Sequence, residues 1–251
     1  MTNLIRSFAP ISLEQMPGVK LMNRTDTKFV TTAERLRLLL EMARQEYYVQ
    51  EIDGVRNLEY DTTYFDTIGF DMYNQHQWNH TNRQKIRFRT YCISGLQFME
   101  VKTKNNHGRT KKKRIEVTDM DVHQKENSDF LAKHLRYGVD TLQPMLNNHF
   151  ERITLVNRAK TERLTIDSRL RFHNMVSDEQ KDMGDLVIIE LKRDGLVYSP
   201  VLEMLRQLHI HPHGFSKYCM GSALTNPQLP VNRFKCKLIE INKIKMKPAE
   251  K

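Results

Sequence analysis

The chain has 251 residues and a formal net charge of +10, with 39% hydrophobic and 28% charged residues. These proportions are typical of a globular protein with a buried core, and they exclude a disordered chain. No apolar run approaches the roughly 18 residues that span a bilayer, and the first residues lack the apolar segment of a secretory signal. The positive charge predicts a polyanionic partner, which is nucleic acid, anionic lipid, a nucleotide or a phosphate polymer.

The cysteine content indicates a reducing compartment. Cys92, Cys219 and Cys236 are too few and too scattered for a disulfide framework or a zinc knuckle. We therefore expect a cytoplasmic protein. The length fits one large β-rich domain or two small ones.

The first predicted elements are a strand over residues 19–30 and a helix directly after it. Thr31 and Glu34 have the spacing of a capping box at the start of this helix, and its apolar residues recur at helical spacing. A strand rich in aromatic and β-branched residues is predicted over 55–66. A short helix is predicted over 70–79.

Residues 83–116 form the most basic stretch of the chain. They contain eleven Lys and Arg but only two acids, Glu100 and Glu116, and so hold almost all of the net charge. Two turns, each containing a glycine, divide the stretch into three predicted strands.

The charged residues of these three strands are predicted to share one face, because every second side chain of a strand points the same way. That face carries Lys85, Arg87, Arg89, Glu100, Lys102, Lys112, Arg114 and Glu116. A single strand of this kind is ordinarily a solvated surface. Three such strands in phase favour a bound anion, since like charges that face each other across a sheet repel.

The next part of the chain is predicted to contain a short helix over 129–136, a connection with Pro144 over 142–148, and alternating strands over 150–158 and 163–172. The side chains expected to share a face are Arg152, Thr154, Val156 and Arg158 in the first strand and Arg163, Thr165, Asp167 and Arg169 in the second.

The last predicted strand covers residues 186–192 and places Glu190 and Lys192 on one face. A glutamate in this position is most often half of an ion pair, here with Lys192 or with an arginine opposite. A short helix follows over 216–224, and its start carries Lys217.

About eight strands and a few short helices predict an α+β protein. The charged strand faces are too numerous for a dry core. A closed antiparallel β-barrel of eight strands, with the short helices packed outside, would collect these faces on one polar lumen. Cations that line such a lumen would surround an extended polyanion.

Eight short runs, taken in order, carry a family resemblance. They are NRTDTK (23–28), YDTTYFD (60–66), FDMYNQH (70–76), residues 83–91, residues 98–104, RLTID (163–167), IIELK (188–192) and SKYCMG (216–221). This set resembles the VTC domain, the catalytic module of the vacuolar transporter chaperone polyphosphate polymerase in the CYTH or triphosphate tunnel metalloenzyme superfamily. The resemblance covers about residues 19–225, which leaves an N-terminal lead-in at 1–18 and a basic C-terminal tail at 226–251.

The resemblance implies a β-tunnel whose basic lumen binds triphosphates and polyphosphate, with Mn²⁺ or Mg²⁺ held by acidic residues. The phosphate contacts that it implies are Lys28, Arg87, Arg89, Lys102, Arg114, Arg152, Arg163 and Lys217. Arg87, Arg89, Lys102 and Arg163 are the candidates for catalysis. Glu190 matches the metal-binding glutamate of the family, and Glu100 is a second candidate metal ligand.

One departure bears on the activity. Many tunnel hydrolases carry Glu-x-Glu-x-Lys on the first strand, where this sequence has Met22 and Arg24. VTC-type members are similar to this sequence there, which favours polymerisation or polyphosphate binding over triphosphate hydrolysis.

The resemblance therefore implies a polymerase that moves the terminal phosphoryl group of ATP onto a growing polyphosphate chain, which is then released or passed to a membrane partner. The alternatives are a non-catalytic tunnel that binds polyphosphate or a nucleotide, a triphosphatase, and an RNA-binding basic barrel. The basic strands carry few exposed aromatic residues of the kind that stack on bases, which argues against the last alternative. No Walker A loop or kinase signature competes.

Overall fold

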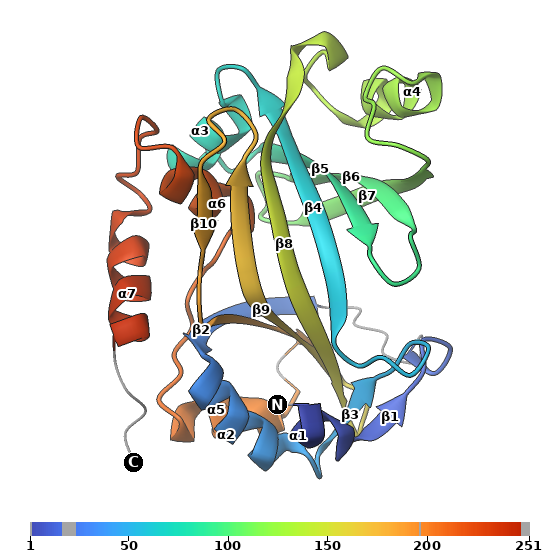
Figure 1. Cartoon of the computed structure of the whole chain (residues 1–251), viewed down its shortest axis with the longest axis vertical. Helices are drawn as coiled ribbons and strands as arrows, with labels where there is room; N and C mark the ends of the chain where they lie inside the picture. Colours follow the sequence, from blue (N-terminus) through green and yellow to red (C-terminus); the bar gives the residue numbers. More distant parts are fainter. Residues whose placement is uncertain (1, 17–23, 196, 247–251) are drawn as a thin grey trace.

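The structure is a computed structural model that describes residues 2–16, 24–195 and 197–246. Within these ranges the strands form one twisted sheet (Figure 1). Its main path is antiparallel throughout, in the order β2-β11-β9-β8-β4-β5-β6-β7. The bounds of these strands are Arg24–Thr32 (β2), Leu186–Asp194 (β11), Glu162–Asn174 (β9), Leu142–Asn157 (β8), Leu58–Thr67 (β4), Arg83–Tyr91 (β5), Gln97–Lys104 (β6) and Thr110–Val117 (β7).

Three short strands extend the sheet. Strand β1 (Ala9–Ile11) pairs in parallel with β3 (Tyr47–Gln50), and β3 pairs with β8. Strand β10 (Gln180–Asp182) pairs with β9.

Helices cover both faces of the sheet. Their bounds are Thr2–Arg6 (α1), Ala33–Ala43 (α2), Asp71–Gln77 (α3), Lys125–His134 (α4), Val139–Thr141 (η2, a 3-10 helix), Pro200–Gln207 (α5), Lys217–Thr225 (α6) and Lys235–Met246 (α7). In Figure 1, α1, α2 and α5 gather below the strands, while α7 runs along the left side and α4 lies at the upper right. No helix in the described ranges is long and apolar enough to cross a membrane.

The α+β class and the antiparallel tunnel architecture predicted from the sequence are confirmed. The sheet curves toward a barrel but stays open, because the described residues of its end strands, β2 and β7, form no backbone pairing with each other. The segment before α6 links the two halves. Lys28 of β2 donates to the carbonyl of Phe215 at 2.9 Å, and Lys85 of β5 donates to the hydroxyl of Ser216 at 2.7 Å.

The outer face of the sheet packs against α1, α2 and α5. Leu39 and Leu40 belong to the buried stripe of α2 and lie in one core cluster with Val187 and Ile189 of β11. Burying one such side chain contributes about 1.5–3 kcal/mol. This contact therefore fixes the strand's orientation, and the alternate residues of β11, Glu190 among them, face the other way.

Helices α6 and α7 cover one end of the opposite face. A Cβ on Gly221 of α6 would come within 2.6 Å of the side chains of Leu146 and Phe172, so only glycine allows this approach. Tyr218 of α6 stacks on Tyr64 of β4, with ring centroids 5.3 Å apart. The start of α6 is thereby held against the sheet.

Strand β8 is longer than the sequence predicts. The sequence indicates a connection over residues 142–148 because of Pro144, but the strand runs from Leu142 to Asn157 without a break. Pro144 lies where the pairing with β4 shifts, beside Tyr64 and Phe65. A bulge tolerates a residue that lacks an N–H group. The predicted connection is therefore wrong.

The alternation of β9 breaks at Arg169. The sequence places Arg169 on the face of Asp167, but its φ is +51° and the pairing with β8 shifts between His149 and Glu151. This bulge turns Arg169 outward, where its Nη1 lies 2.9 Å from Glu151 Oε1. The prediction is wrong for Arg169, because one extra residue inverts the faces beyond a bulge.

Two further boundaries differ from the prediction. The N-cap of α2 is Thr32, whose hydroxyl accepts the N–H of Arg35, and not Thr31. Helix α4 begins at Lys125, earlier than the sequence indicates. The basic tail contains α7, for which the sequence predicts no element. Met22 lies outside the described residues.

Candidate phosphate-binding site

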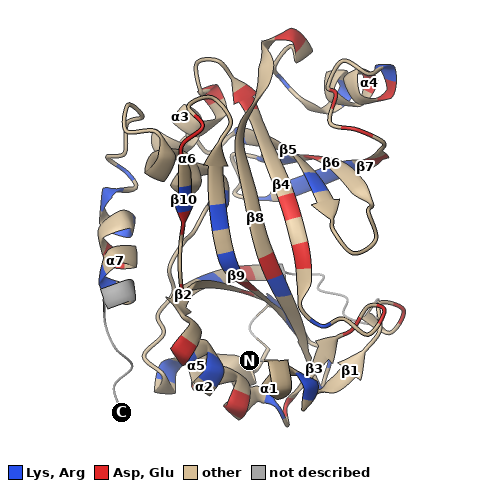
Figure 2. Cartoon of the chain, viewed as in Figure 1, with Lys and Arg blue, Asp and Glu red and all other residues tan. Residues whose placement is uncertain are grey.

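One face of the curved sheet gathers many basic side chains from separate strands. We call it the inner face; it is opposite the face that α2 covers. Figure 2 marks the Lys and Arg positions along β5 to β7 and along β9. The cations that strand alternation and α6 place on the inner face include Lys28, Lys85, Arg87, Arg89, Lys102, Lys112, Arg114, Arg152, Arg163, Lys192 and Lys217. The acids on this face are Asp26, Glu100, Glu116, Asp167, Glu190 and Asp194. All eight residues predicted to contact phosphate are therefore on one face.

The deep wall, formed by Arg89, Arg152, Asp167 and Lys217, is the most buried part. Asp167 accepts from Arg152 Nε at 2.6 Å and from Arg152 Nη2 at 2.8 Å, and Lys217 Nζ donates to Asp167 Oδ2. Burial raises the pKa of Asp167, but the two cations outweigh it and hold the pKa well below its usual value. Burial also lowers the pKa of Lys217, which Asp167 opposes. One ionised carboxylate thus serves two cations.

Two aromatic rings support the guanidinium groups of the deep wall. Tyr60 and Phe150 stack with centroids 5.4 Å apart, and the Cζ atoms of Arg89 and Arg152 lie 5.5 and 5.3 Å from the Tyr60 centroid. Arg89 is 6% exposed and donates to the hydroxyl of Thr62 at 3.1 Å. Burial, followed by neighbouring guanidinium charges, lowers its pKa to about 10. No carboxylate of the described residues forms an ion pair with Arg89, which leaves it suited to bind an anion.

The rim, formed by Arg87, Glu100, Lys102, Lys112 and Arg114, is more open. Glu100 is 2% exposed, and it accepts from Arg87 Nε at 2.6 Å and from Lys112 Nζ at 2.8 Å. Burial raises the pKa of Glu100, but neighbouring cations, with Arg87 the strongest, lower it to about 2. Arg114 is exposed, and its Cζ lies 4.6 Å from the centroid of the Phe98 ring. Solvent therefore reaches the cations of the rim.

Glu190 lies among lysines. It pairs in register with Lys28 of β2, and its Oε2 is 2.5 Å from Lys192 Nζ. The predicted ion pair with Lys192 is confirmed. Burial raises the pKa of Glu190, but Lys28 and Lys192 hold it well below its usual value. Arg163 of β9 stands opposite Lys192 in register.

Lys102 shows how closely the ends of the sheet approach each other. It lies on β6, whereas Lys28 and Glu190 lie on β2 and β11, at the other end of the path. Burial among these side chains and the charge of Lys28 lower the pKa of Lys102 to about 8, although Glu190 opposes this. The side chain still reaches solvent. Charges from both ends of the sheet therefore act within one site.

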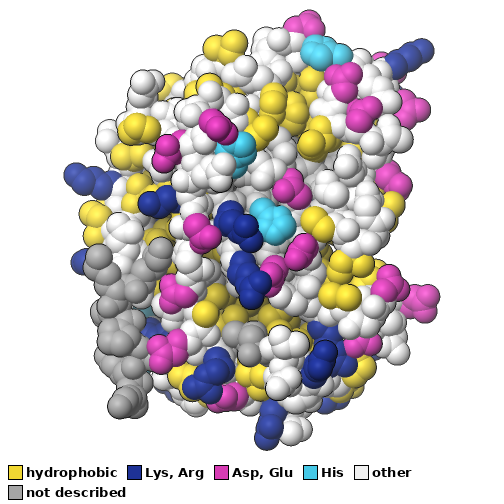
Figure 3. All heavy atoms as spheres, in the orientation of Figure 1, with side chains coloured by type: hydrophobic (Ala, Val, Ile, Leu, Met, Phe, Trp, Pro, Cys, Tyr) yellow, Lys and Arg dark blue, Asp and Glu magenta, His cyan; other side chains and the backbone are white. Residues whose placement is uncertain are grey.

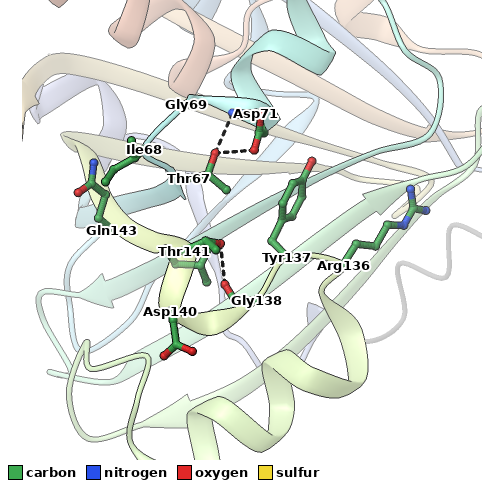
Figure 4. A pocket seen from close by; sticks show the side chains of 11 residues that line it. Thr67, Ile68, Gly69, Asp71, Arg136, Tyr137, Gly138, Asp140, Thr141 and Gln143 are labelled. Atoms are coloured by element: carbon green, nitrogen blue, oxygen red, sulfur yellow. Dashed lines mark hydrogen bonds between the residues drawn. The ribbon is translucent and has the colours of Figure 1, made fainter.

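A separate pocket lies where β4 leads into α3 (Figure 4). It has a volume of about 530 Å³ and eleven lining residues. Among these, Asp71 and Asp140 are acidic and Arg136 is the single basic residue. Its lining has no excess of positive charge, so it does not suit a phosphate chain.

The outer surface over β4, β8 and β9 is also unsuited to a polyanion. Figure 3 shows Lys and Arg interspersed with Asp and Glu on this side. Arg169 pairs with Glu151, and His149 lies 3.9 Å from Asp61. The strongest positive field therefore belongs to the inner face.

Four residues of the site, Asp167, Lys85, Lys112 and Lys192, were not among those predicted from the sequence. Each of them shares a strand face with a predicted site residue, which for Lys192 is Glu190, so the alternation alone was a sufficient signal. The contact of the Tyr60 ring with two arginines could not be predicted from alternation, because it depends on which strands pair.

Few acidic groups are placed to bind a metal ion. The described residues contain no group of three or more His, Cys, Asp or Glu side chains that could hold one. Both oxygens of Glu100 bond cations, and Glu190 bonds Lys192. Mg²⁺ accepts one or two carboxylates when phosphate oxygens complete its shell. These residues therefore fit a cation that binds together with phosphate.

The fold and the basic inner face define a triphosphate tunnel domain. Residues 23–226 match the family model of the VTC domain, and the chain belongs to that family. Comparison with curated protein sequences found no match.

Two solved structures share the fold. One is a candidate adenylate cyclase from Bacillus halodurans, with a TM-score of 0.51 and 14% identity over 78% of this chain and 96% of that chain. The other is a candidate adenylyl cyclase from Hippeastrum, described as having a dominant triphosphatase activity, with a TM-score of 0.50 and 14% identity over 84% of this chain and 99% of that chain.

Proposed function

We propose that this chain is a metal-dependent polyphosphate polymerase, which transfers the terminal phosphoryl group of ATP onto a growing inorganic polyphosphate chain. The observation that carries the proposal is the meeting of cations from seven strands and α6 on one face, with Glu190 among them. Arginine offers two parallel donors to phosphate oxygens and lysine a point charge. A linear polyanion matches cations spread along a face better than a compact anion does.

In the proposed reaction, a terminal oxygen of the phosphate chain attacks the γ-phosphorus of ATP. The bond to the β-phosphate breaks, ADP leaves, and the chain gains one phosphate. Phosphoryl transfer depends mainly on alignment and on neutralising charge. Arg89 and Arg152 both lie over the Tyr60 ring, and Arg152 also bonds Asp167. These contacts fix the two guanidinium groups, so they would hold phosphates in a constant position.

The four proposed catalytic cations are Arg87, Arg89, Lys102 and Arg163. They lie on three strands of the inner face and would stabilise the charge that develops on the transferred group. Lys217, at the start of α6, would add a contact to the chain beside Asp167.

Glu190 is the proposed protein ligand of a bound Mn²⁺ or Mg²⁺. Such an ion neutralises adjacent phosphate oxygens when it is bound. The sequence indicates Glu100 as a second ligand, but both of its oxygens bond cations. We assign Glu100 the positioning of Arg87 instead.

The test is incubation with ATP and Mn²⁺, followed by sizing of the phosphate product. We expect polymer growth and ADP release, and loss of both in Glu190→Ala. Glu203→Ala on the surface of α5 is the matched control, because that glutamate pairs only with Arg206 and Gln207 on its own helix. Inorganic phosphate without polymer would indicate a triphosphatase. Tight tripolyphosphate binding without turnover would indicate a binding domain, and displacement of tripolyphosphate by single-stranded RNA would contradict the proposed ligand.

A further inference from the structure

A second group of cations lies where the inner face meets α7. We call Arg83, Lys85, Arg233 and Lys237 the α7 cluster; they come from β5, from the residues before α7, and from α7 itself. All four charges act on His76 of α3. Burial is the largest cause of its lowered pKa, and these four cations add to it, so that the pKa falls to about 2. The His76 ring lies 5.7 Å from that of Phe234, the residue after Arg233, so side chains from separate segments of the chain meet near His76.

The α7 cluster has little compensating charge. No carboxylate of the described residues forms an ion pair with any of the four cations. Burial and the charge of Arg233 lower the pKa of Lys237; Glu240 opposes this shift, but its carboxylate lies 3.0 Å from the His213 ring. Cations held together without an acid repel one another, and a bound anion would remove that cost.

A hydrogen-bonding group faces the same place. His76 Nδ1 is buried and has no hydrogen-bond partner among the described residues. Burial, and after it the neighbouring cations, lower the pKa of this imidazole and keep it neutral. A neutral imidazole can carry a proton on this nitrogen and donate it to an oxyanion. The surroundings thus suit phosphate oxygens.

The α7 cluster continues the inner face. Lys85 belongs to both, and Lys28 is among the charges that add to the effect of burial in lowering the pKa of Lys237. The segment just before α6 forms two hydrogen bonds with Lys28. The N–H of His213 donates to the Lys28 carbonyl at 2.7 Å, and Lys28 Nζ donates to the carbonyl of Phe215. The α7 cluster therefore lies next to the part of the inner face that holds Lys28 and Lys85.

We propose that the α7 cluster binds the part of a polyphosphate chain that extends beyond the inner face. A short triphosphate occupies the inner face alone, whereas a long chain also reaches α7. The class of ligand rests on the proposed function. The prediction of two connected sections rests on the charges and contacts of α7.

The test compares tripolyphosphate with a chain of about one hundred phosphates, titrated onto the whole protein. The variant is Arg233→Ala combined with Lys237→Ala. The control is Lys235→Ala combined with Lys243→Ala, which removes the same charge from exposed positions on the same helix. We expect the variant to lose about tenfold in affinity for the long chain, equivalent to one charge-assisted hydrogen bond. Tripolyphosphate affinity should stay within about twofold, as should both affinities of the control.

A second variant changes geometry without changing charge. A Cβ on Gly214 would lie 2.9 Å from Lys237 Nζ, so Gly214→Ala should displace this amine and weaken the long chain selectively. An unchanged preference for the long chain in both variants would overturn the inference, as would an equal loss in the control or for tripolyphosphate. Failure of the wild-type protein to bind tripolyphosphate would instead overturn the proposed function.

Discussion

The deep wall and the rim of the inner face use the same arrangement in different surroundings. In each, one carboxylate bonds two cations: Asp167 bonds Arg152 and Lys217, and Glu100 bonds Arg87 and Lys112. The wall lies under α6 and beside stacked rings, whereas the rim lies on strands near an open end of the sheet.

This difference predicts how each charge affects the stability of the folded protein. A charge removed from water is expensive unless it is paired, so changes in the wall should alter stability. A solvated charge costs and contributes little, so changes at the exposed cations of the rim, such as Arg114, should leave stability almost unchanged. The contrast can be tested by substitutions on the two sides.

The largest expected effect is on stability and belongs to Asp167→Asn. This change leaves Arg152 and Lys217 buried without their counter-charge, and we expect the free energy of unfolding to fall by about 3–5 kcal/mol. Urea denaturation measures it. Asp140→Asn is the control, because the Asp140 side chain is 97% exposed. Excess tripolyphosphate should restore part of the loss, since it binds only the folded chain. A variant as stable as the wild type would mean that Asp167 is not the counter-ion of the wall.

Arg89→Met should separate binding from stability. Methionine keeps apolar contact with Tyr60 and Phe150 but removes the charge. With a pKa of about 10, lowered from 12.5, Arg89 is protonated at pH 7, so the cost of burying its charge is present there and falls only as the pH rises above 10. We expect the melting temperature to hold or rise. Tripolyphosphate affinity should fall about 10- to 100-fold, as measured by calorimetry. A large drop in stability would show that Arg89 holds the wall together.

Lys102 should make binding depend on pH. Because its pKa is about 8, Lys102 is charged at pH 7 and mostly neutral at pH 9. We expect the affinity for tripolyphosphate to weaken about three- to tenfold from pH 7 to pH 9. This change corresponds to the loss of one contact that contributes roughly 1 kcal/mol to the binding free energy. Lys102→Arg keeps its charge at both values. Its titration curve should therefore be flatter, and an equally steep curve would assign the effect to another group.

The smallest effect should come from Arg114→Ala at the rim. This side chain is exposed and stacks on Phe98, so the free energy of unfolding should change by less than about 0.5 kcal/mol. Tripolyphosphate affinity should fall less than about threefold. A fall in the free energy of unfolding as large as that of Asp167→Asn would remove the distinction between wall and rim.

Local patterns in the sequence were sufficient to predict which side chains of each inner-face strand share a face. Arg87 and Arg89 alternate with Ile86 and Phe88, which lie in a core cluster on the other side of β5. Alternation follows from the geometry of a single strand, so no knowledge of its neighbours is needed. The start of α6 could also be predicted from neighbouring residues, because the hydroxyl of Ser216 caps the helix by accepting the N–H of Cys219.

Bulges and pairings could not be predicted in this way. The bulge at Arg169 inverts one face, and the pairing of β8 with β9 sets Arg152 opposite Asp167. Register depends on contacts between segments distant in sequence, which alternation within one strand does not specify.

The sequence by itself determined which side chains of each strand share a face and that these faces are basic. Only the tertiary structure decided that Lys102 and Lys28 act on each other, that Asp167 serves two cations, and that the charge continues to Lys237. The reason is physical: alternation is a property of one strand, whereas charges meet only after the whole sheet has curved and α6 and α7 have packed against it.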